Sequence, residues 1–354
     1  MKGLDLVEDL RKRKETLFTH PTPLERMKNI SSLTGVEIFI KREDLIGCGF
    51  GGNKIRKMEY LIEDIKNKGA DTVLTWGGIQ SNWCRAMSSI CRIFGIEPYL
   101  ILFKRKNLPD DLGGNVLLEN FSGAKISIVE GEGKKLIKLD DIWEIVSENL
   151  QNLEKMGRKT YLAPIGASIP EGSMEVSWGG IAYLDCFYEL MEQCDTLGIE
   201  PDWIVHATGS GSTQAGLIAG SKLMGVKTKI LGISVSETKV KFEEIVRFIL
   251  ENIQNYIQVN LEIKDEEIKI VDDYIGDGYG IVSRELVNSI KIVAEKEGIF
   301  LDPVYTGKAM VGLLDLINKG FFKKNEKIIF MHTGGLPALF SYKEKLEEFL
   351  KEQR

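Results

Sequence analysis

The sequence predicts an α/β protein in which mostly parallel sheets are flanked by helices. Short runs rich in Val, Ile and Leu alternate with segments of helical period along most of the 354 residues. This alternation is typical of parallel strands that helices cover on both faces. The chain exceeds the size at which one hydrophobic core keeps growing, so we expect two domains. A long loop at 166–180 interrupts the alternation and is the natural division between them.

The elements before this loop are assigned from their apolar period and from glycines that end helices, as Gly69 does. We expect strands at 36–41, 71–76, 98–103, 125–130 and 160–165, and helices at 54–69, 80–95, 116–123 and 140–157.

After the loop the alternation resumes with the same signals. We expect helices at 182–194, 213–225, 241–255, 282–297 and 308–318, and strands at 202–208, 227–235 and 327–333.

Composition excludes several classes of function. The formal charge of −6 and the pI near 5.5 argue against a nucleic-acid surface, and we interpret the basic run at 11–14 as a solvated helix end. No stretch has the ~20 apolar residues of a membrane span. Five cysteines without a CxxC pair suit a reducing cytoplasm, and three scattered histidines give no metal-ligand spacing.

Four loops lie where a strand leads toward a helix, the position at which α/β sheets bind ligands. They are "GCGFGGNK" (47–54), "GGIQSN" (77–82), "ATGSGSTQAG" (207–216) and "HTGG" (332–335).

The loop at 208–213, "TGSGST", has the composition of a phosphate site. Its small residues let backbone N–H groups converge at a helix N-terminus, and Ser210, Ser212 and Thr213 add hydroxyl donors. A tight strand–helix turn is the alternative, although turns rarely need so many hydroxyl groups. The segment is not a Walker A loop, since no Gly-Lys-Ser/Thr follows.

The glycine loop before Lys54 suggests a rival class. Gly47, Gly49 and Gly52 satisfy G-x-G-x-x-G, and Asp71 lies at the distance of a ribose contact, as in nicotinamide-dependent oxidoreductases. The charged segment "KREDLI" separates the preceding strand from the first glycine, which strains this reading. A P-loop is also strained, because Lys54 comes one position late.

Lys54 falls in the first turn of a predicted helix. The helix dipole lowers the pKa of an amine there, and partial burial lowers it further. A neutral amine is what a nucleophilic, Schiff-base lysine needs. A plain surface charge is the alternative.

Together these loops resemble the pyridoxal-5′-phosphate (PLP) enzymes of the tryptophan-synthase-β-like fold, and within them the D-cysteine desulfhydrases and 1-aminocyclopropane-1-carboxylate (ACC) deaminases. Eight motifs carry the resemblance in chain order: "HPTPLERM" (20–27), "IKREDL" (40–45), "GGNKIRKMEYL" (51–61), "GGIQSNWCR" (77–85), "ATGSGSTQAGL" (207–217), "DDYIGDGYG" (272–280), "LDPVYTGKAM" (301–310) and "HTGGLPALF" (332–340).

The resemblance implies two domains with PLP in the cleft between them: a larger one, 1–54 and 170–354, that binds the phosphate, and a smaller one, 55–169. It also implies a homodimer that acts on a small amino acid, and the cysteine pattern places it in the cytoplasm.

The resemblance also implies the roles of individual residues. Lys54 would carry the cofactor covalently, Asn82 would contact the phenolic oxygen, and the phosphate would lie on Thr208, Gly209, Ser210, Gly211 and Thr213. The substrate would be held by Gln80, Ser81 and Asn82. The catalytic residues would be Lys54, Ser81, Tyr279 and Tyr305, with core packing as the alternative for both tyrosines.

Thr306 discriminates between the two activities of the resemblance. ACC deaminases have a glutamate here, beside the pyridine nitrogen, and the desulfhydrases have a neutral hydroxyl. A carboxylate would keep the nitrogen protonated and make the ring a deeper electron sink. We therefore expect β-elimination, with D-cysteine giving pyruvate, ammonia and hydrogen sulfide.

Other activities stay open, namely ACC deaminase, cysteate sulfo-lyase, diamino-acid ammonia-lyase and a catalytically silent binding protein. The loop at 166–180, with Glu171, Glu175 and Trp178, departs from the family pattern. It either is a longer surface connection or reaches the cleft. Trp83 is a second bulky feature that would narrow the pocket.

Overall fold

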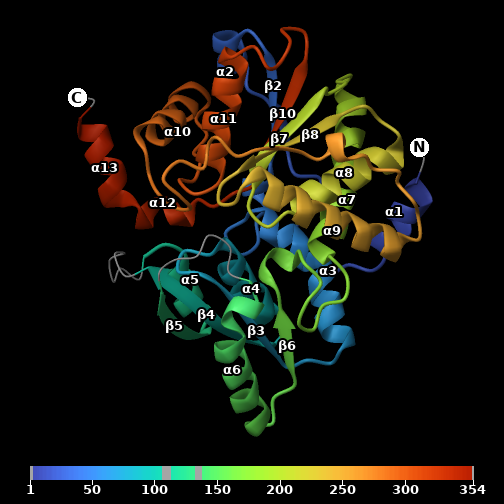
Figure 1. Cartoon of the computed structure of the whole chain (residues 1–354), viewed down its shortest axis with the longest axis vertical. Coiled ribbons are helices and arrows are strands. Elements are labelled where there is room, and N and C mark those ends of the chain that lie inside the picture. Colours follow the sequence, from blue (N-terminus) through green and yellow to red (C-terminus); the bar gives the residue numbers. More distant parts are fainter. Residues whose placement is uncertain (1–2, 106–112, 132–137, 353–354) are drawn as a thin grey trace.

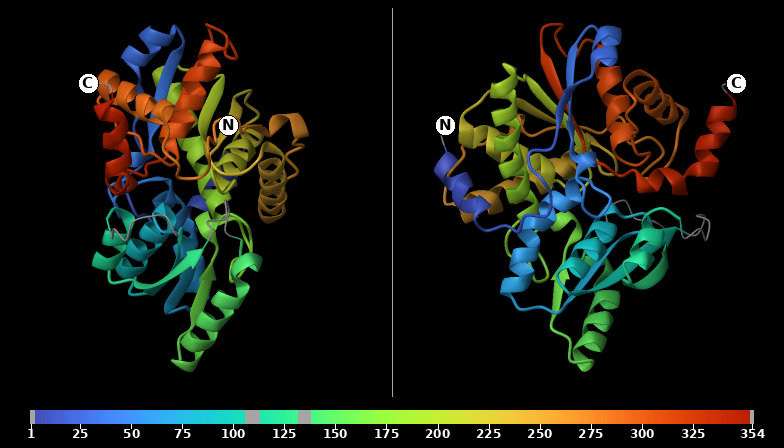
Figure 2. Two further views of the ribbon diagram at one scale, coloured as in Figure 1. Left: turned by 60° about the vertical axis from the view of Figure 1, so that its left-hand side comes forward. Right: turned by 180° about the vertical axis from the view of Figure 1, so that it is seen from behind.

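A computed structural model describes residues 3–105, 113–131 and 138–352. It contains two sheets, each flanked by helices, one above the other in Figure 1 and seen from two further sides in Figure 2. The predicted α/β class with mostly parallel sheets is confirmed.

The larger sheet has six strands, of which only β1 runs antiparallel to its neighbour. In spatial order they are β1 (Leu24–Arg26), β2 (Glu37–Arg42), β10 (Lys327–His332), β7 (Trp203–Thr208), β8 (Lys229–Ser234) and β9 (Lys269–Val271).

The smaller sheet has four strands, all parallel. In spatial order they are β5 (Lys125–Gly131), β4 (Glu97–Arg105), β3 (Thr72–Gly78) and β6 (Thr160–Ala163).

The helices agree with the predicted ones to within a few residues, and α1, α2, α12 and α13 are additions. The helices are α1 (Leu4–Arg11), α2 (Lys28–Thr34), α3 (Asn53–Asn67), α4 (Asn82–Ile93), α5 (Asn115–Phe121), α6 (Trp143–Lys155), α7 (Trp178–Leu197), α8 (Ser212–Met224), α9 (Lys239–Ile257), α10 (Arg284–Glu297), α11 (Thr306–Asn318), α12 (Pro337–Ser341) and α13 (Lys343–Lys351).

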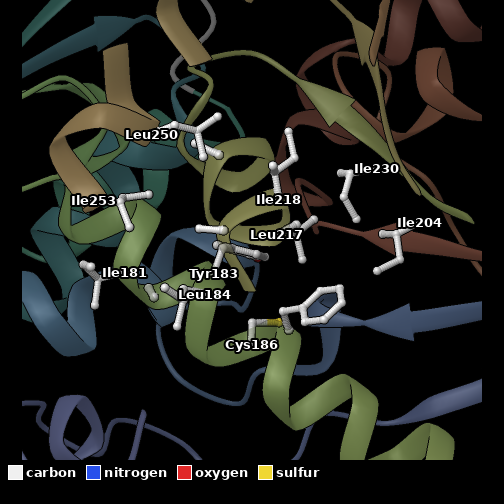
Figure 3. Packing of buried hydrophobic residues seen from close by; sticks show 14 of the residues in the cluster. Ile181, Tyr183, Leu184, Cys186, Ile204, Leu217, Ile218, Ile230, Leu250 and Ile253 are labelled. Atoms are coloured by element: carbon white, nitrogen blue, oxygen red, sulfur yellow. The ribbon is translucent and has the colours of Figure 1, made fainter. Parts of the chain in front are cut away.

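Both faces of the larger sheet are covered, which explains its continuous apolar strands. All six residues of β7 are buried. Ile204 packs with the cluster of α7, α8 and α9, whose side chains converge in Figure 3, whereas Val205 packs with that of α2, α10 and α11. The alternation of side chains along a strand sends neighbours to opposite faces.

Helix α3 belongs to the cores of both sheets. Its Tyr60 packs in the cluster of α7 and α8, and its Ile55 and Leu61 pack with α4 and the smaller sheet. The strands of the smaller sheet lie between residues 72 and 163. Since α3 contacts both halves, the boundary expected at 54/55 stays a prediction.

The basic run at 11–14 ends α1, as expected, but it is not fully solvated. Nε of Arg11 lies 2.6 Å from Asp185, and Nζ of Lys14 lies 2.9 Å from the same carboxylate. The side chain of Lys14 is only 10% exposed. The prediction of a solvated end is wrong at these two residues, because Asp185 on α7 supplies an internal partner.

Among the helices of the described residues, none combines the length and the apolar composition that a membrane span requires.

Candidate active site

A pocket lies between the two sheets, where loops run into the N-termini of helices from both. Its lining comes from α3, the start of α4, the β7–α8 turn, the start of α11 and the segment after β10. The residues are Asn53, Lys54, Ser81, Asn82, Trp83, Ile165, His206, Ala207, Thr208, Gly209, Ser210, Gly211, Thr213, Gln214, Tyr305, Thr333 and Gly334.

The glycine loop before α3 packs closely against two other backbone segments, at Asp44 and at Thr333. A β-carbon on Gly51, which has φ of 72°, would lie 2.4 Å from the carbonyl oxygen of Asp44. Gly52 has φ of 95° and precedes Asn53, whose N–H donates to the carbonyl of Thr333 at 3.0 Å. The loop is therefore a tight turn against β10 rather than a dinucleotide cradle. Asp71 is not in the pocket lining, so it does not support the interpretation as a nicotinamide-dependent oxidoreductase.

Lys54 lies on the first turn of α3 and faces this pocket. Burial lowers the pKa of its amine to about 8, and we find no hydrogen-bond partner for it among the described residues. Removal from water disfavours the charged form of an amine. The amine of Lys54 thus becomes neutral near pH 8, far below the usual value of 10.5, as a nucleophile requires.

Lys57, one turn further along α3, differs from Lys54 in its environment. It is fully buried, and its Nζ donates to Oγ of Ser212 at 2.9 Å. Burial, and then the charge of Lys54, lower its pKa well below the usual range. The sequence alone does not distinguish the two lysines, but of the two only Lys54 lines the pocket.

The hydroxyl-rich turn lies at the N-terminus of α8 and lines the same pocket as Lys54. Oγ1 of Thr208 donates to Oε1 of Gln214 at 2.9 Å, which fixes the end of β7. Gly211 has φ of 86° and caps the helix. The N–H groups of the first turn therefore point into the pocket, where an anion is stabilised.

The loop at 166–180 reaches this turn with residues at both of its ends: a β-carbon on Gly179 would lie 2.7 Å from Oγ of Ser212. The hydroxyl of Ser168 lies 2.7 Å from Oγ of Ser210 and 2.6 Å from Oγ of Ser212. Glu171, Glu175 and Trp178 are absent from the pocket lining. The loop supports the serine turn from behind, and α7 already begins at Trp178.

Ser81 and Asn82 begin α4 and face the pocket from the smaller sheet. Oγ of Ser81 accepts the N–H of Cys84 at 3.2 Å. Gln80 is not in the lining, because its amide is used elsewhere. Its Nε2 donates to the carbonyl of Gly113, and its Oε1 accepts the N–H of Asn115.

The two tyrosines form a hydroxyl pair. The oxygens of Tyr279 and Tyr305 lie 2.6 Å apart, and their rings meet edge to face at 5.8 Å. Burial raises the pKa of both phenols. Tyr305 lines the pocket, whereas Tyr279 contacts Tyr305 and is not among the lining residues.

Thr306 is buried at the start of α11 and is absent from the lining. Its hydroxyl donates to Oδ1 of Asp302 at 2.7 Å and accepts the backbone N–H of Asp302 at 2.8 Å. A hydroxyl has one hydrogen and two lone pairs. Toward any further group, Thr306 can therefore only accept.

Sequence reasoning missed His206 as a pocket residue. Nδ1 of its buried ring donates to the carbonyl of Ala207 at 3.0 Å, and its Nε2 has no partner in the described structure. Burial lowers its pKa to about 4, so the ring is neutral. The signal was present, since His206 stands two residues before Thr208 on the same face of β7.

The pocket has the features that a phosphorylated aromatic aldehyde requires. Its lining combines an amine of lowered pKa with a hydroxyl-rich helix N-terminus. A β-carbon on Gly209 would come within 3.0 Å of the ring of Tyr305, so only glycine leaves this wall open. No group of three His, Cys, Asp or Glu side chains could hold a metal ion in the described ranges.

Fold and site define the class of PLP-dependent enzymes with the tryptophan-synthase-β-like fold. Residues 15–334 match the family model described as pyridoxal-phosphate dependent enzyme. The chain belongs to this family.

Curated relatives match over nearly their whole length. A protein of Thermotoga maritima named putative 1-aminocyclopropane-1-carboxylate deaminase is 38% identical, over 93% of this chain and 98% of its own. One of Pyrococcus abyssi with the same name is 36% identical, over 95% of each chain. The 1-aminocyclopropane-1-carboxylate deaminase of Bradyrhizobium diazoefficiens is 34% identical, over 91% and 94%.

A solved structure agrees with the fold. The crystal structure of an ACC deaminase homologue superposes with a TM-score of 0.85 and 32% sequence identity, covering 97% of this chain and 98% of that chain.

Proposed function

We propose that this PLP-dependent enzyme catalyses β-elimination on a small D-amino acid, with D-cysteine as the preferred substrate. D-cysteine and water would give pyruvate, ammonia and hydrogen sulfide. The observation that carries the proposal is the neutral, buried Thr306 at the start of α11.

Thr306 supports β-elimination through the cofactor's ring nitrogen. Because its hydroxyl hydrogen is donated to Asp302, Thr306 would offer that nitrogen only a lone pair of a neutral oxygen. A neutral acceptor holds a proton on the nitrogen less firmly than a carboxylate does. Charge that develops at the α-carbon is then less stabilised, which favours prompt departure of a β-substituent.

The residues present suit the cofactor. Lys54 would bind it covalently, Asn82 would donate to its phenolic oxygen, and the phosphate would lie on Thr208, Gly209, Ser210, Gly211 and Thr213. When bound, the pyridoxal ring supplies the electron sink for the substrate's α-carbon.

The chain's own groups would move the protons. Nζ of Lys54, neutral above a pKa of about 8, would remove the α-proton from the substrate. Ser81 would offer its hydroxyl hydrogen to the substrate carboxylate. The hydroxyl of Tyr305, held by Tyr279 at 2.6 Å, would donate to the departing sulfur.

A second candidate is deamination of ACC, which the names of the relatives favour. Its product is 2-oxobutanoate, whereas D-cysteine yields pyruvate, so the products distinguish the two. Cysteate sulfo-lyase and diamino-acid ammonia-lyase activities would also yield pyruvate, but with sulfite or a second ammonia.

The test is a product screen on the purified yellow enzyme. D-cysteine, O-acetyl-D-serine, β-chloro-D-alanine and ACC are supplied separately, and pyruvate, 2-oxobutanoate and sulfide are measured. Pyruvate from the D-amino acids supports the proposal, and turnover of ACC alone contradicts it. Lys54→Ala should abolish the activity, whereas Lys12→Ala, on an exposed side chain, should not.

The homodimer and the cytoplasmic location remain predictions. Light scattering of the purified chain tests the first.

A further inference from the structure

We infer that Asn115 is a positioning residue that sets the direction of the Asn82 amide, so that Asn82 presents N–H rather than oxygen to the cofactor's phenolic oxygen. The inference rests on the proposed contact between Asn82 and that oxygen. Its evidence is a chain of buried hydrogen bonds from Arg85 through Asn115 to Asn82.

The chain starts at Arg85, which is 1% exposed. Its Nε lies 2.8 Å from Oδ1 of Asn115. A guanidinium carries hydrogen-bond donors and no acceptor. The Asn115 atom that it contacts is therefore the oxygen, whichever way the amide is drawn.

The other end of the Asn115 amide must then be its NH2 group. It lies 3.0 Å from the backbone carbonyl of Gln80, which can only accept, and this contact independently supports the assignment. The same NH2 group lies 2.9 Å from a side-chain atom of Asn82. That atom must be the oxygen of Asn82, because two NH2 groups cannot bond to each other.

Asn82 is left with its NH2 group for the pocket, which it lines. We find no other partner for Nδ2 of Asn82 among the described residues. Asn115 is itself 0% exposed, so water does not compete for its amide. The direction of the Asn82 amide is thus fixed from behind before any ligand enters.

Arg85 ties this chain to the loop before Lys54. Its Nη2 donates to the carbonyl of Gly51 at 3.0 Å, and its Nη1 donates to that of Gly49. One cation therefore holds both the turn that places Lys54 and the amide that orients Asn82.

Asn115→Asp tests the direction of the amide. The new carboxylate still accepts from Arg85, but its second oxygen now faces Asn82 and forces that amide to turn. The oxygen of Asn82 would then face the anionic oxygen of the cofactor. A donor stabilises the deprotonated form of the group that it contacts, so losing the donor raises the pKa.

The measurement is a pH titration of the visible absorption band of the holoenzyme. Asn82→Ala should raise the midpoint by roughly one to two pH units, as for loss of one charge-assisted hydrogen bond. Asn115→Asp should raise it similarly. In the Asn82→Ala background, adding Asn115→Asp should shift it no further, because the effect acts through Asn82.

The outcomes separate the inference from the proposed function. A shift with Asn82→Ala and none with Asn115→Asp overturns the positioning role alone. A shift from Asn115→Asp that persists in the Asn82→Ala background also overturns it, since the new charge then acts directly. No shift with Asn82→Ala overturns both the Asn82 contact and the inference.

Asn115→Ala provides a second variant if Asn115→Asp does not fold. It adds no charge and leaves the Asn82 amide unguided, so a smaller upward shift is expected in the parent and none in Asn82→Ala. An unchanged midpoint in Asn115→Ala contradicts the inference.

Discussion

Nδ1 of His20 lies 2.8 Å from Oε2 of Glu189 on α7. The other nitrogen of the same ring lies 3.0 Å from Oε1 of Glu59 on α3. The imidazole therefore joins the two helices through carboxylates that are almost inaccessible to water, with Glu59 at 0% and Glu189 at 7% side-chain exposure. The cations Arg56 and Lys14 face the same cluster.

The first prediction is a pH-dependent contribution of His20 to stability. Burial opposes its charge, but the hydrogen bonds to Glu189 and Glu59 outweigh burial and raise the pKa of His20. Its stabilisation is thus fully present below the unfolded value of about 6.5 and is lost as the pH rises through the folded value. His20→Gln should cost about 1 kcal/mol more at pH 5.5 than at pH 9, measured by urea unfolding. An equal cost at both pH values contradicts this.

The second prediction concerns Arg56, which binds two carboxylates behind the pocket. Its Nε lies 2.7 Å from Glu43, and its Nη1 lies 3.0 Å from Glu189. Arg56→Met leaves Glu43 buried without its ion-pair partner, whereas Glu189 keeps Lys41 at 2.5 Å. An uncompensated buried carboxylate costs about 3–5 kcal/mol. Thermal unfolding should show a large drop in Tm. Asp9→Asn, which breaks an exposed pair with Lys12, is the control and should leave Tm unchanged.

The third prediction uses the lowered pKa of Lys54. The amine reacts only when neutral, so the rate at which the apoenzyme takes up pyridoxal phosphate should rise with pH and level off above about pH 8. Stopped-flow absorbance measures this rate. Lys54→Met should develop no covalent band at any pH. A rate that keeps rising to pH 10 would mean that the amine is not buried as described.

The fourth prediction separates the two tyrosines. Tyr305 lines the pocket and Tyr279 does not, although their hydroxyls share a hydrogen bond of 2.6 Å. Tyr305→Phe should reduce kcat by about 100-fold or more, in the range of a proton-transfer group. Tyr279→Phe should reduce it less, with KM little changed in both. Steady-state kinetics decide, and the reverse order contradicts the assignment.

The fifth prediction concerns the hydroxyl of Thr306. Thr306→Val removes the acceptor of the Asp302 N–H and a donor to its carboxylate, which costs about 1–3 kcal/mol in a buried site. Thr306→Ser keeps both hydrogen bonds and is the matched control. A difference in Tm between these two variants tests the prediction, and equal values contradict it.

Much of the fold could be predicted because its period is strong. The strands around Val205 and Leu74 carry apolar residues on both faces, so their composition alone predicts that they are buried. The short strand β9 (Lys269–Val271) and β1 (Leu24–Arg26) were missed. Three residues give no detectable period, and such strands form only because a neighbouring strand offers its edge.

The site was harder to predict where partners come from distant segments. Lys54 and the 208–213 turn follow from local glycine and hydroxyl patterns, and both line the pocket except for Ser212, which is buried against Lys57 and Ser168. Gln80 looks like a pocket residue in sequence, but Asn115 and Gly113 take its amide. Such competition depends on tertiary contacts and leaves no local signal. The same holds for Lys14, whose partner Asp185 is 171 residues away.

Helix α3 packs into two cores while carrying Lys54 at its first turn. A motion that separates the two sheets would therefore have to break the packing of α3 in one of the two cores. A core substitution near either sheet that shifts α3 would therefore also shift Lys54, so the packing of both cores determines where the nucleophile lies.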